Sequence, residues 1–302
     1  MNVLSLFDGM SCGQIALEKC GVKVDKYFAS EIDKFAVQVA KKNYPNTVHL
    51  GDVRNVKGDD LPKIDLLMGG SPCQGFSFSG KQLNFDDERS KLFFKFVRIL
   101  GETKPKYFLL ENVRMKKEYQ DIISAYLGVE PIMINSSLVS AQSRNRLYWT
   151  NIPNVKQPQE RHIFLGDIVE SPLHERPSVV SRCDLQTREK IFSHVQHLLG
   201  DSKYRDNFKW RWDGEGRILV TRPDGLKIQR VGRIAFADNK AEIVTALTQP
   251  TVAFRKVTPL ECERLQTVPD NYTSGVSKSQ RYKMLGNGWT VDVISHILSG
   301  IK

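Results

Sequence analysis

The chain has 302 residues, of which 40% are hydrophobic and 26% charged, as expected for a globular protein with one large or two modest domains. No apolar run reaches the roughly 18 residues that a membrane-spanning helix needs, which argues against a membrane protein. The five cysteines are scattered, without a C-x-x-C pair. This pattern argues against a disulfide framework and a zinc site, and favours a reducing, cytoplasmic compartment.

The first 150 residues alternate between short apolar runs and stretches with helical spacing. We expect strands at residues 3–7, 26–30, 48–53, 64–70 and 107–113, and helices at residues 11–21, 31–43 and 91–105. The opening MNVLSLFDGM lacks the basic start and cleavage site of a signal peptide, so it is read as the first strand. This alternation predicts an α/β fold with a doubly wound, mostly parallel sheet.

In such a sheet, ligands bind beyond the carboxyl ends of the strands. The residues expected at those ends are four carboxylates and one thiol, within the segments Asp8-Gly9, Glu31, Asp52, Ser71-Pro72-Cys73 and Glu111-Asn112. The sequence therefore predicts a reaction centre along one rim.

After residue 150 the alternation stops. Residues 151–254 are rich in turn residues, with short strand-like runs, and are expected to form a smaller irregular and β domain; residues 255–302 return to helical patterns and are expected to complete the first domain. Between residues 140 and 256 there are 20 Lys and Arg residues against 13 Asp and Glu, and the whole chain has a net charge of +10. This surplus suits a polyanion-binding face, although an ordinary basic protein explains it equally well.

The turn FDGMSCG (7–13) has glycines where a strand passes into a helix, which suits a ligand close to the backbone. An ordinary βα turn is an equally good reading of it. Glu31, at the end of the second strand, stands where ribose hydroxyls are bound in nucleoside-binding sheets, and Asp52 could accept from an adenine amino group. Together they favour an adenosine-containing cofactor.

The stretch GGSPCQGFS (69–77) places one thiol behind a proline at a strand end. On position alone, Cys73 could be a packed core cysteine, a metal ligand, half of a disulfide or a nucleophile. Taken in order, FDGMSCG, GGSPCQGFS, ENV (111–113), QSRNRLYW (142–149), TPLECERLQTVPDNY (258–272) and LGNGWTVDVI (285–294) resemble the motifs of the DNA (cytosine-5)-methyltransferases. The first and last stretches also resemble the animal de novo branch of that family.

This resemblance implies a Rossmann-like methyltransferase fold with a target-recognition domain, and it implies the chemistry. Cys73 would add to C6 of a cytosine and so activate C5, as covalent catalysis requires. Glu111 would protonate or hydrogen-bond N3. Arg144 and Arg146 would steady the base O2, the thiol and nearby phosphates. The target base must first leave the DNA duplex, at a cost of a few kcal/mol.

The family's methyl donor is S-adenosylmethionine, which leaves as S-adenosylhomocysteine, and no metal is expected. The resemblance implies that the donor pocket is lined by Phe7, Asp8, Gly9, Ser11, Glu31, Ile32, Asp52, Val53, Pro72, Leu92, Asn287, Gly288 and Trp289. The chain departs from the common bacterial pattern at Ser11 and Cys12, where glycines are usual. It departs again at Gly288-Trp289, where Ser and a small apolar residue are usual.

Double-stranded DNA is the expected partner. The residues expected to contact it are Ser71, Gln74, Ser77, Ser79, Gln142, Arg217, Arg222, Arg230 and Arg233, of which the last four belong to the basic segment. A bacterial or phage enzyme acting in restriction-modification is expected, as a monomer or a homo-oligomer.

The alternatives are a tRNA or RNA cytosine methyltransferase and a DNA-binding regulator with the same fold. The first is disfavoured because the tRNA-methylating cousin's Cys-Phe-Thr signature is absent, and the second because both Cys73 and Glu111 are present.

Overall fold

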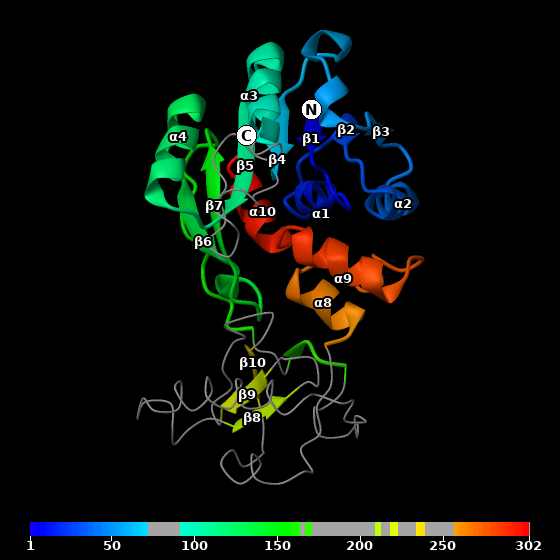
Figure 1. The fold of residues 1–302 in the computed structure, drawn as a ribbon, viewed down its shortest axis with the longest axis vertical. Helices are drawn as coiled ribbons and strands as arrows, with labels where there is room; N and C mark the ends of the chain where they lie inside the picture. The colour runs from blue at the N-terminus through cyan, green and yellow to red at the C-terminus, as the bar shows by residue number, and fades with distance from the viewer. Residues whose placement is uncertain are drawn as a thin grey trace. The chain divides into compact units, whose positions relative to one another are not determined.

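The computed structural model describes residues 1–71, 91–163, 167–170, 209–212, 218–222, 234–238 and 257–301 (Figure 1). The chain divides into two compact units. The first comprises residues 1–135, 145–158 and 266–302, and the second comprises residues 136–144 and 159–265. None of the helices in the described ranges is long and apolar enough to cross a bilayer.

A seven-stranded sheet forms the centre of the first unit, in the order β3-β2-β1-β4-β5-β7-β6. Its strands are β1 (Asn2–Leu6), β2 (Lys26–Ser30), β3 (Val48–His49), β4 (Leu66–Gly69), β5 (Tyr107–Val113), β6 (Ile132–Asn135) and β7 (Asn145–Thr150). The first five strands are parallel, and β7 runs antiparallel to both β5 and β6. The predicted doubly wound, mostly parallel sheet is confirmed.

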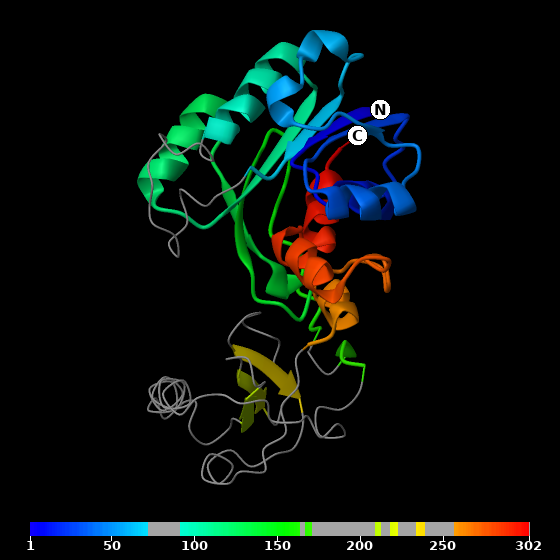
Figure 2. The ribbon, with the colours of Figure 1, turned by 45° about the vertical axis from the view of Figure 1, so that its right-hand side comes forward.

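Helices cover both faces of this sheet, as parallel strands require. They are α1 (Cys12–Lys19), α2 (Lys34–Asn43), α3 (Lys91–Thr103), α4 (Lys117–Leu127) and α10 (Val291–Leu298), and α9 (Lys278–Asn287) precedes α10 in the chain. Figure 2 shows α3 and α4 on one side of the sheet, with α1, α2 and α10 on the other. The C-terminal segment therefore completes the layer begun by the first two helices.

The packing follows from the alternation of side chains along each strand. Leu4 and Leu6 of β1 are fully buried in a cluster with Phe93 and Phe96 of α3. On the opposite face, α1 packs so closely that a Cβ on its Gly13 would lie 2.7 Å from Cε of Met68 and 2.8 Å from the Tyr27 hydroxyl. Both faces of the sheet are thus buried.

Two features differ from the sequence-based expectations. Strand β3 ends at His49, because Gly51 turns into the left-handed region with φ 71°. Asp52 instead caps a 3₁₀ helix at Val53–Asn55. Strand β5 has the predicted bounds, and its residue Glu111 lies opposite Tyr148 of β7.

The second unit contains the helix α8 (Pro259–Leu265) and a three-stranded sheet in the order β10-β9-β8. Its strands are β8 (Lys209–Trp212), β9 (Ile218–Arg222) and β10 (Ile234–Asp238). Strand β9 overlaps the strand-like run GRILVT (216–221), and β10 overlaps the end of the run KIQRVGRIAF (227–236). A small core joins Ala141, Ile168 and Leu265.

Candidate active site

The order of the central sheet reverses between β1 and β4. From β1 the chain builds outward through β2 and β3, and from β4 it builds the other way through β5. Ligands of open α/β sheets bind outside the carboxyl ends of the strands at such a reversal. The turn after β1 and the residues Gly70 and Ser71 after β4 occupy this position.

The turn after β1 has an unusual backbone. Phe7, Gly9 and Ser11 have φ values of 56°, 60° and 65°, so all three adopt the left-handed conformation. This conformation is costly for Phe7 and Ser11, which carry side chains, and such residues cluster at ligand sites. A Cβ on Gly9 would meet no atom within 4 Å, so the backbone of Gly9 faces open space.

Beneath this turn, Asp8 is buried in a polar cluster. The Tyr27 hydroxyl donates a hydrogen bond to Oδ1 of Asp8 at 2.7 Å, and the Ser11 hydroxyl donates to Oδ2. Burial raises the pKa of Asp8 to about 6, against the lowering effect of these hydrogen bonds. Ser11, one of the two departures in this turn, therefore contributes to holding the turn together.

Glu31 follows β2 and binds the same turn. Its Oε2 accepts a hydrogen bond from the N–H of Gly9 at 2.8 Å, and its Oε1 accepts from the N–H groups of Ile32 and Asp33, each at 2.8 Å. Three backbone donors thus fix the carboxylate at the rim. Each oxygen of a carboxylate accepts about two hydrogen bonds, so Oε2 retains room for a ligand hydroxyl.

The other predicted donor-pocket residues have different surroundings. Asp52 is paired with Arg54, whose Nε and Nη2 donate to its carboxylate at 2.9 and 2.5 Å, and this bonding lowers the pKa of Asp52. Ile32 is exposed, whereas Val53 is buried and Leu92 is half-buried, both against the hydrophobic core. Asn287 is exposed at the end of α9, beside the half-buried Gly288.

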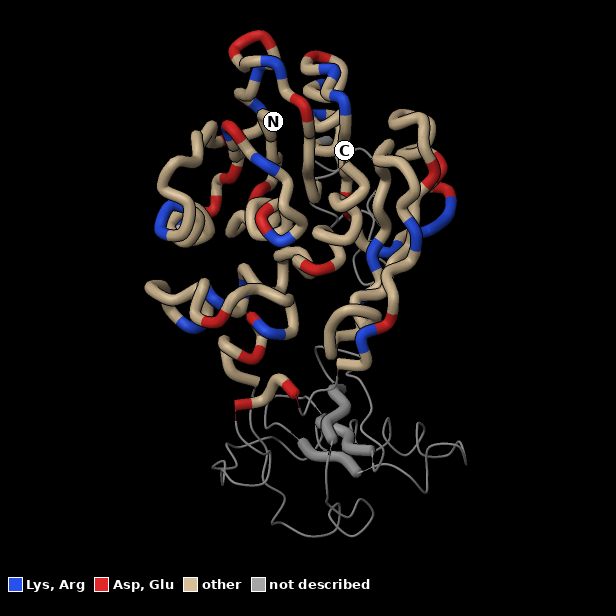
Figure 3. Tube along the Cα trace, turned by 180° about the vertical axis from the view of Figure 1, so that it is seen from behind, with Lys and Arg blue, Asp and Glu red and all other residues tan. Residues whose placement is uncertain are grey.

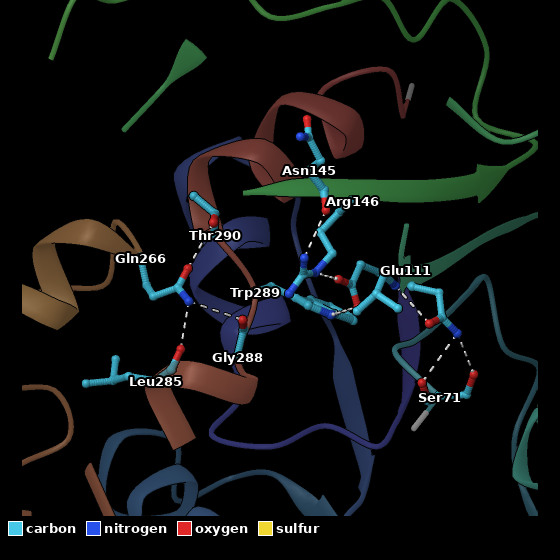
Figure 4. Close-up of polar contacts among 11 residues, drawn as sticks. Ser71, Glu111, Asn145, Arg146, Gln266, Leu285, Gly288, Trp289 and Thr290 are labelled. Carbon is cyan, nitrogen blue, oxygen red and sulfur yellow. Dashed lines mark hydrogen bonds and ion pairs between the residues drawn. The ribbon is translucent and has the colours of Figure 1, made fainter. Parts of the chain in front are cut away.

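Glu111 is the centre of a second cluster, on β5 (Figure 4). Its Oε1 lies 3.0 Å from Nε of Arg146 on β7, and its Oε2 accepts a hydrogen bond from Nε1 of Trp289 at 3.2 Å. The contact with Arg146 is an ion pair without an aligned hydrogen bond from Nε. Glu111 is only 9% exposed. The guanidinium of Arg146 lies close enough to compensate the charge of this buried carboxylate.

Next to Glu111, Asn112 connects β5 to the end of β4. Its Nδ2 donates to the hydroxyl of Ser71 at 3.3 Å, and its Oδ1 accepts from the N–H of Val113 at 2.8 Å. Ser71 is the last described residue before Pro72 and Cys73. The contact therefore anchors the start of the predicted nucleophile loop one strand away from Glu111.

The turn between α9 and α10 carries Trp289, and the buried side chain of Gln266 holds it. Nε2 of Gln266 donates to the carbonyl of Leu285 at 2.7 Å, and its Oε1 accepts from the Thr290 hydroxyl at 2.9 Å. The carbonyl of Gln266 accepts from the N–H of Val291 at 2.9 Å. One residue thus fixes the turn on both sides of Trp289 (Figure 4).

Two of the predicted site residues belong to the second unit. The half-buried Arg144 accepts a hydrogen bond at its backbone carbonyl from the N–H of Ser136, at 3.0 Å. The buried Gln142 donates from Nε2 to the carbonyl of Leu265 at 3.0 Å. Its predicted contact with DNA stays a prediction, as does that of the buried Ser71.

Other predicted side chains lie outside the described residues: Pro72, Cys73, Gln74, Ser77, Ser79, Arg217, Arg222, Arg230 and Arg233. Most of the basic segment also lies outside the described residues. In the view of Figure 3, acidic and basic residues of the first unit are interspersed. Among the described residues, no cluster of three or more His, Cys, Asp or Glu side chains could hold a metal ion.

The sequence-based list of site residues omits three with clear roles here: Tyr27, Asn112 and Gln266. Asn112 belongs to the ENV motif and Gln266 to the LQTVP stretch, so their neighbours in sequence were a usable signal. Tyr27 carries no such signal, because it is one aromatic residue in an apolar strand.

Comparisons with known proteins agree with this geometry. Residues 1–302 match the family model described as C-5 cytosine-specific DNA methylase. The type II methyltransferase M1.ScrFI of Lactococcus lactis subsp. cremoris is 30% identical, over 98% of this chain and 76% of the relative. The type II methyltransferase M.HhaI of Haemophilus parahaemolyticus is 29% identical, over 100% of this chain and 94% of the relative.

A solved structure of the Entamoeba histolytica methyltransferase EhMeth superimposes with a TM-score of 0.70 at 18% identity. The match covers 100% of this chain and 99% of that chain. At this identity the likeness concerns the fold, and it extends over the whole length.

Proposed function

Because its full length matches the family model, the chain belongs to the C-5 cytosine-specific DNA methylases, and we propose that it methylates cytosine C5 at specific sequences in duplex DNA. The observation that carries the proposal is the position of Glu111, held by Arg146 and Trp289 one strand away from Ser71. A carboxyl group beside the segment that leads into Cys73 supports the proposal. A cytosine activated at C6 needs such a group at N3.

The residues at the sheet reversal fit S-adenosylmethionine as methyl donor. Glu31 presents a fixed carboxylate for the ribose hydroxyls, exposed Ile32 offers an apolar surface for the adenine ring, and Gly9 leaves its backbone open. The chemistry that the bound donor supplies is an electrophilic methyl group on a sulfonium. Asp52 would accept from the adenine amino group, in exchange for part of its contact with Arg54.

In the proposed mechanism the Cys73 thiolate adds to C6 of the extruded cytosine, and a carbon–sulfur bond forms. Electron density moves toward N3, where Glu111 donates a proton or a hydrogen bond, and C5 becomes nucleophilic. Once C5 carries the methyl group, with S-adenosylhomocysteine as the leaving product, a water molecule takes the C5 proton, the C5–C6 double bond returns and the Cys73 thiolate leaves. Glu111 takes back any proton that it gave to N3. Arg146 stabilises the carboxylate of Glu111 whenever it is charged.

We assign target recognition to residues 151–254. Their basic side chains suit contacts with phosphates and with guanine edges in the major groove. Arg144 and Gln142, which precede this segment, would contact the target strand near the extruded base. The type II relatives are consistent with a role in restriction-modification.

The test is a methylation assay with labelled S-adenosylmethionine and three substrates: mixed-sequence duplex DNA, single-stranded DNA and tRNA. We expect label in duplex DNA only, as 5-methylcytosine at one recurring sequence. Label on adenine or in tRNA alone would contradict the proposal. Cys73→Ala should abolish methyl transfer and retain DNA binding. The matched control is Cys20→Ala, because Cys20 is a half-buried thiol at the C-terminal end of α1.

A further inference from the structure

The indole of Trp289 lies between the carboxylate of Glu111 and the first turn of α1. Its Nε1 donates to Oε2 of Glu111 at 3.2 Å, while its Cζ3 lies 3.6 Å from the position that a Cβ on Gly13 would take. The residue is 8% exposed. One side chain therefore contacts the carboxylate of Glu111 and lies next to Gly13 in the helix that follows the donor-binding turn.

The two oxygens of Glu111 have different partners. Arg146 contacts Oε1 from β7, and Trp289 contacts Oε2 from the turn before α10. A carboxylate bound at one oxygen can still rotate about its terminal bond, whereas partners at both oxygens fix its plane. The Trp289 contact is thus the second of the two restraints on this group.

The indole lies close to the backbone of Gly70. A Cβ on Gly70 would lie 2.9 Å from Nε1 of Trp289 and 3.1 Å from Oε2 of Glu111. A Cβ on Gly288 would lie 3.0 Å from the carbonyl oxygen of Met284 and 3.1 Å from Cε of Met10. A side chain at Gly70 would therefore crowd both the indole and the carboxylate, and one at Gly288 would require its neighbours to shift by a few tenths of an ångström.

We infer that Trp289 is a positioning residue for methyl transfer, whose N–H holds Oε2 so that the carboxyl group of Glu111 faces the target base. The inference rests on the proposed function. It assigns to Trp289 an effect on the rate of transfer, whereas a residue that only lines the donor pocket would affect donor binding.

The test uses Trp289→Phe, which keeps a buried aromatic ring and removes the N–H donor. Hydrogen bonds to charged groups are strong enough that we expect the single-turnover rate to fall about ten- to a hundredfold. The Kd for S-adenosylhomocysteine should stay near the wild-type value. The matched control is Trp149→Phe, because Nε1 of Trp149 donates at 3.0 Å to Ser124, in the same unit but outside the cluster of Glu111. That variant should retain the wild-type rate.

A double-mutant cycle separates positioning from a general structural effect. In a Glu111→Ala background the acceptor is gone, so adding Trp289→Phe should cause no further loss of rate. Gly70→Ala tests the same contact with the indole retained, and should lower the rate without weakening donor binding. Thermal unfolding confirms that each variant is folded.

Three results would overturn the inference: a wild-type rate in Trp289→Phe, a weaker Kd with an unchanged rate, or losses that multiply in the double variant. If the wild-type protein methylates DNA and any of these results is found, the role inferred for Trp289 is wrong and the proposed function stands. A wild type that methylates no DNA removes the proposed function and the inference with it.

Discussion

The Tyr27 hydroxyl donates a hydrogen bond to Oδ1 of Asp8 at 2.7 Å, linking β2 to the turn that follows β1. Ser11 donates to the other oxygen of the same carboxyl group. Both donors favour the ionised form, yet burial dominates and raises the pKa of Asp8 from 3.8 to about 6. The turn that is proposed to bind the donor is therefore built over a carboxyl group that is costly to ionise.

This relationship predicts a pH-dependent stability. Between pH 4 and pH 7 the folded state holds the Asp8 proton more tightly than the unfolded state, so the unfolding free energy falls as the pH rises. Asp8→Asn removes this titration. From the shift of the pKa, the unfolding free energy of Asp8→Asn should rise by about 2–3 kcal/mol relative to that of wild type between pH 4 and pH 7.

The measurement is urea unfolding of both proteins at several pH values. The difference between the two free energies isolates Asp8, because the other titrating groups are common to both proteins. A difference that stays constant from pH 4 to pH 7 would show that Asp8 titrates normally in the folded state.

Glu31 is predicted to control donor affinity. Glu31→Gln replaces one carboxylate oxygen by an NH₂ group, which cannot accept the backbone hydrogen bonds now made from Gly9 or from Ile32 and Asp33. The variant should raise the Kd for S-adenosylhomocysteine about tenfold or more, measured by calorimetry. Glu102→Gln is the control, because Glu102 also accepts a backbone N–H, from Gly58 at 2.8 Å, outside the strand-end turns. If both variants bind S-adenosylhomocysteine equally well, Glu31 does not contact the donor.

Gln266 is predicted to matter for stability. Gln266→Ala leaves the carbonyl of Leu285 and the hydroxyl of Thr290 without their buried partner, which should cost about 2–4 kcal/mol of unfolding free energy. Gln157→Ala is the control, since Gln157 makes a similar bond to the carbonyl of Met133, at 2.8 Å, on the exposed surface. Similar denaturation midpoints for wild type and Gln266→Ala would contradict this role.

The sheet and its rim were predictable because both depend on local patterns. The apolar runs predicted β1, β2, β4 and β5, and parallel strands bring Asp8, Glu31 and Glu111 to one region of the sheet. The antiparallel strand β7 was not predicted, since its pairing with β5 joins residues far apart in sequence.

The contacts that fix the candidate site were less predictable than its members. Trp289 was expected in the donor pocket, but its bond to Glu111 spans 178 positions and has no local signature. Likewise, nothing in the run KYFAS marks Tyr27 as a donor to Asp8. Motifs identify which side chains gather at the rim, whereas tertiary packing decides which of them touch.

The last prediction concerns Glu111 itself. Glu111→Gln keeps the size of the side chain and an acceptor for Trp289, but it cannot deliver a proton to N3. Positioned proton transfer contributes about 10²–10⁴ in rate, so the single-turnover rate of methylation should fall by a factor in that range while DNA affinity stays unchanged. Glu118→Gln, at an exposed position on α4, should keep the full rate. A Glu111→Gln enzyme as fast as wild type would show that proton transfer from residue 111 does not contribute to the rate, because the amide leaves hydrogen bonding as its only remaining role at N3.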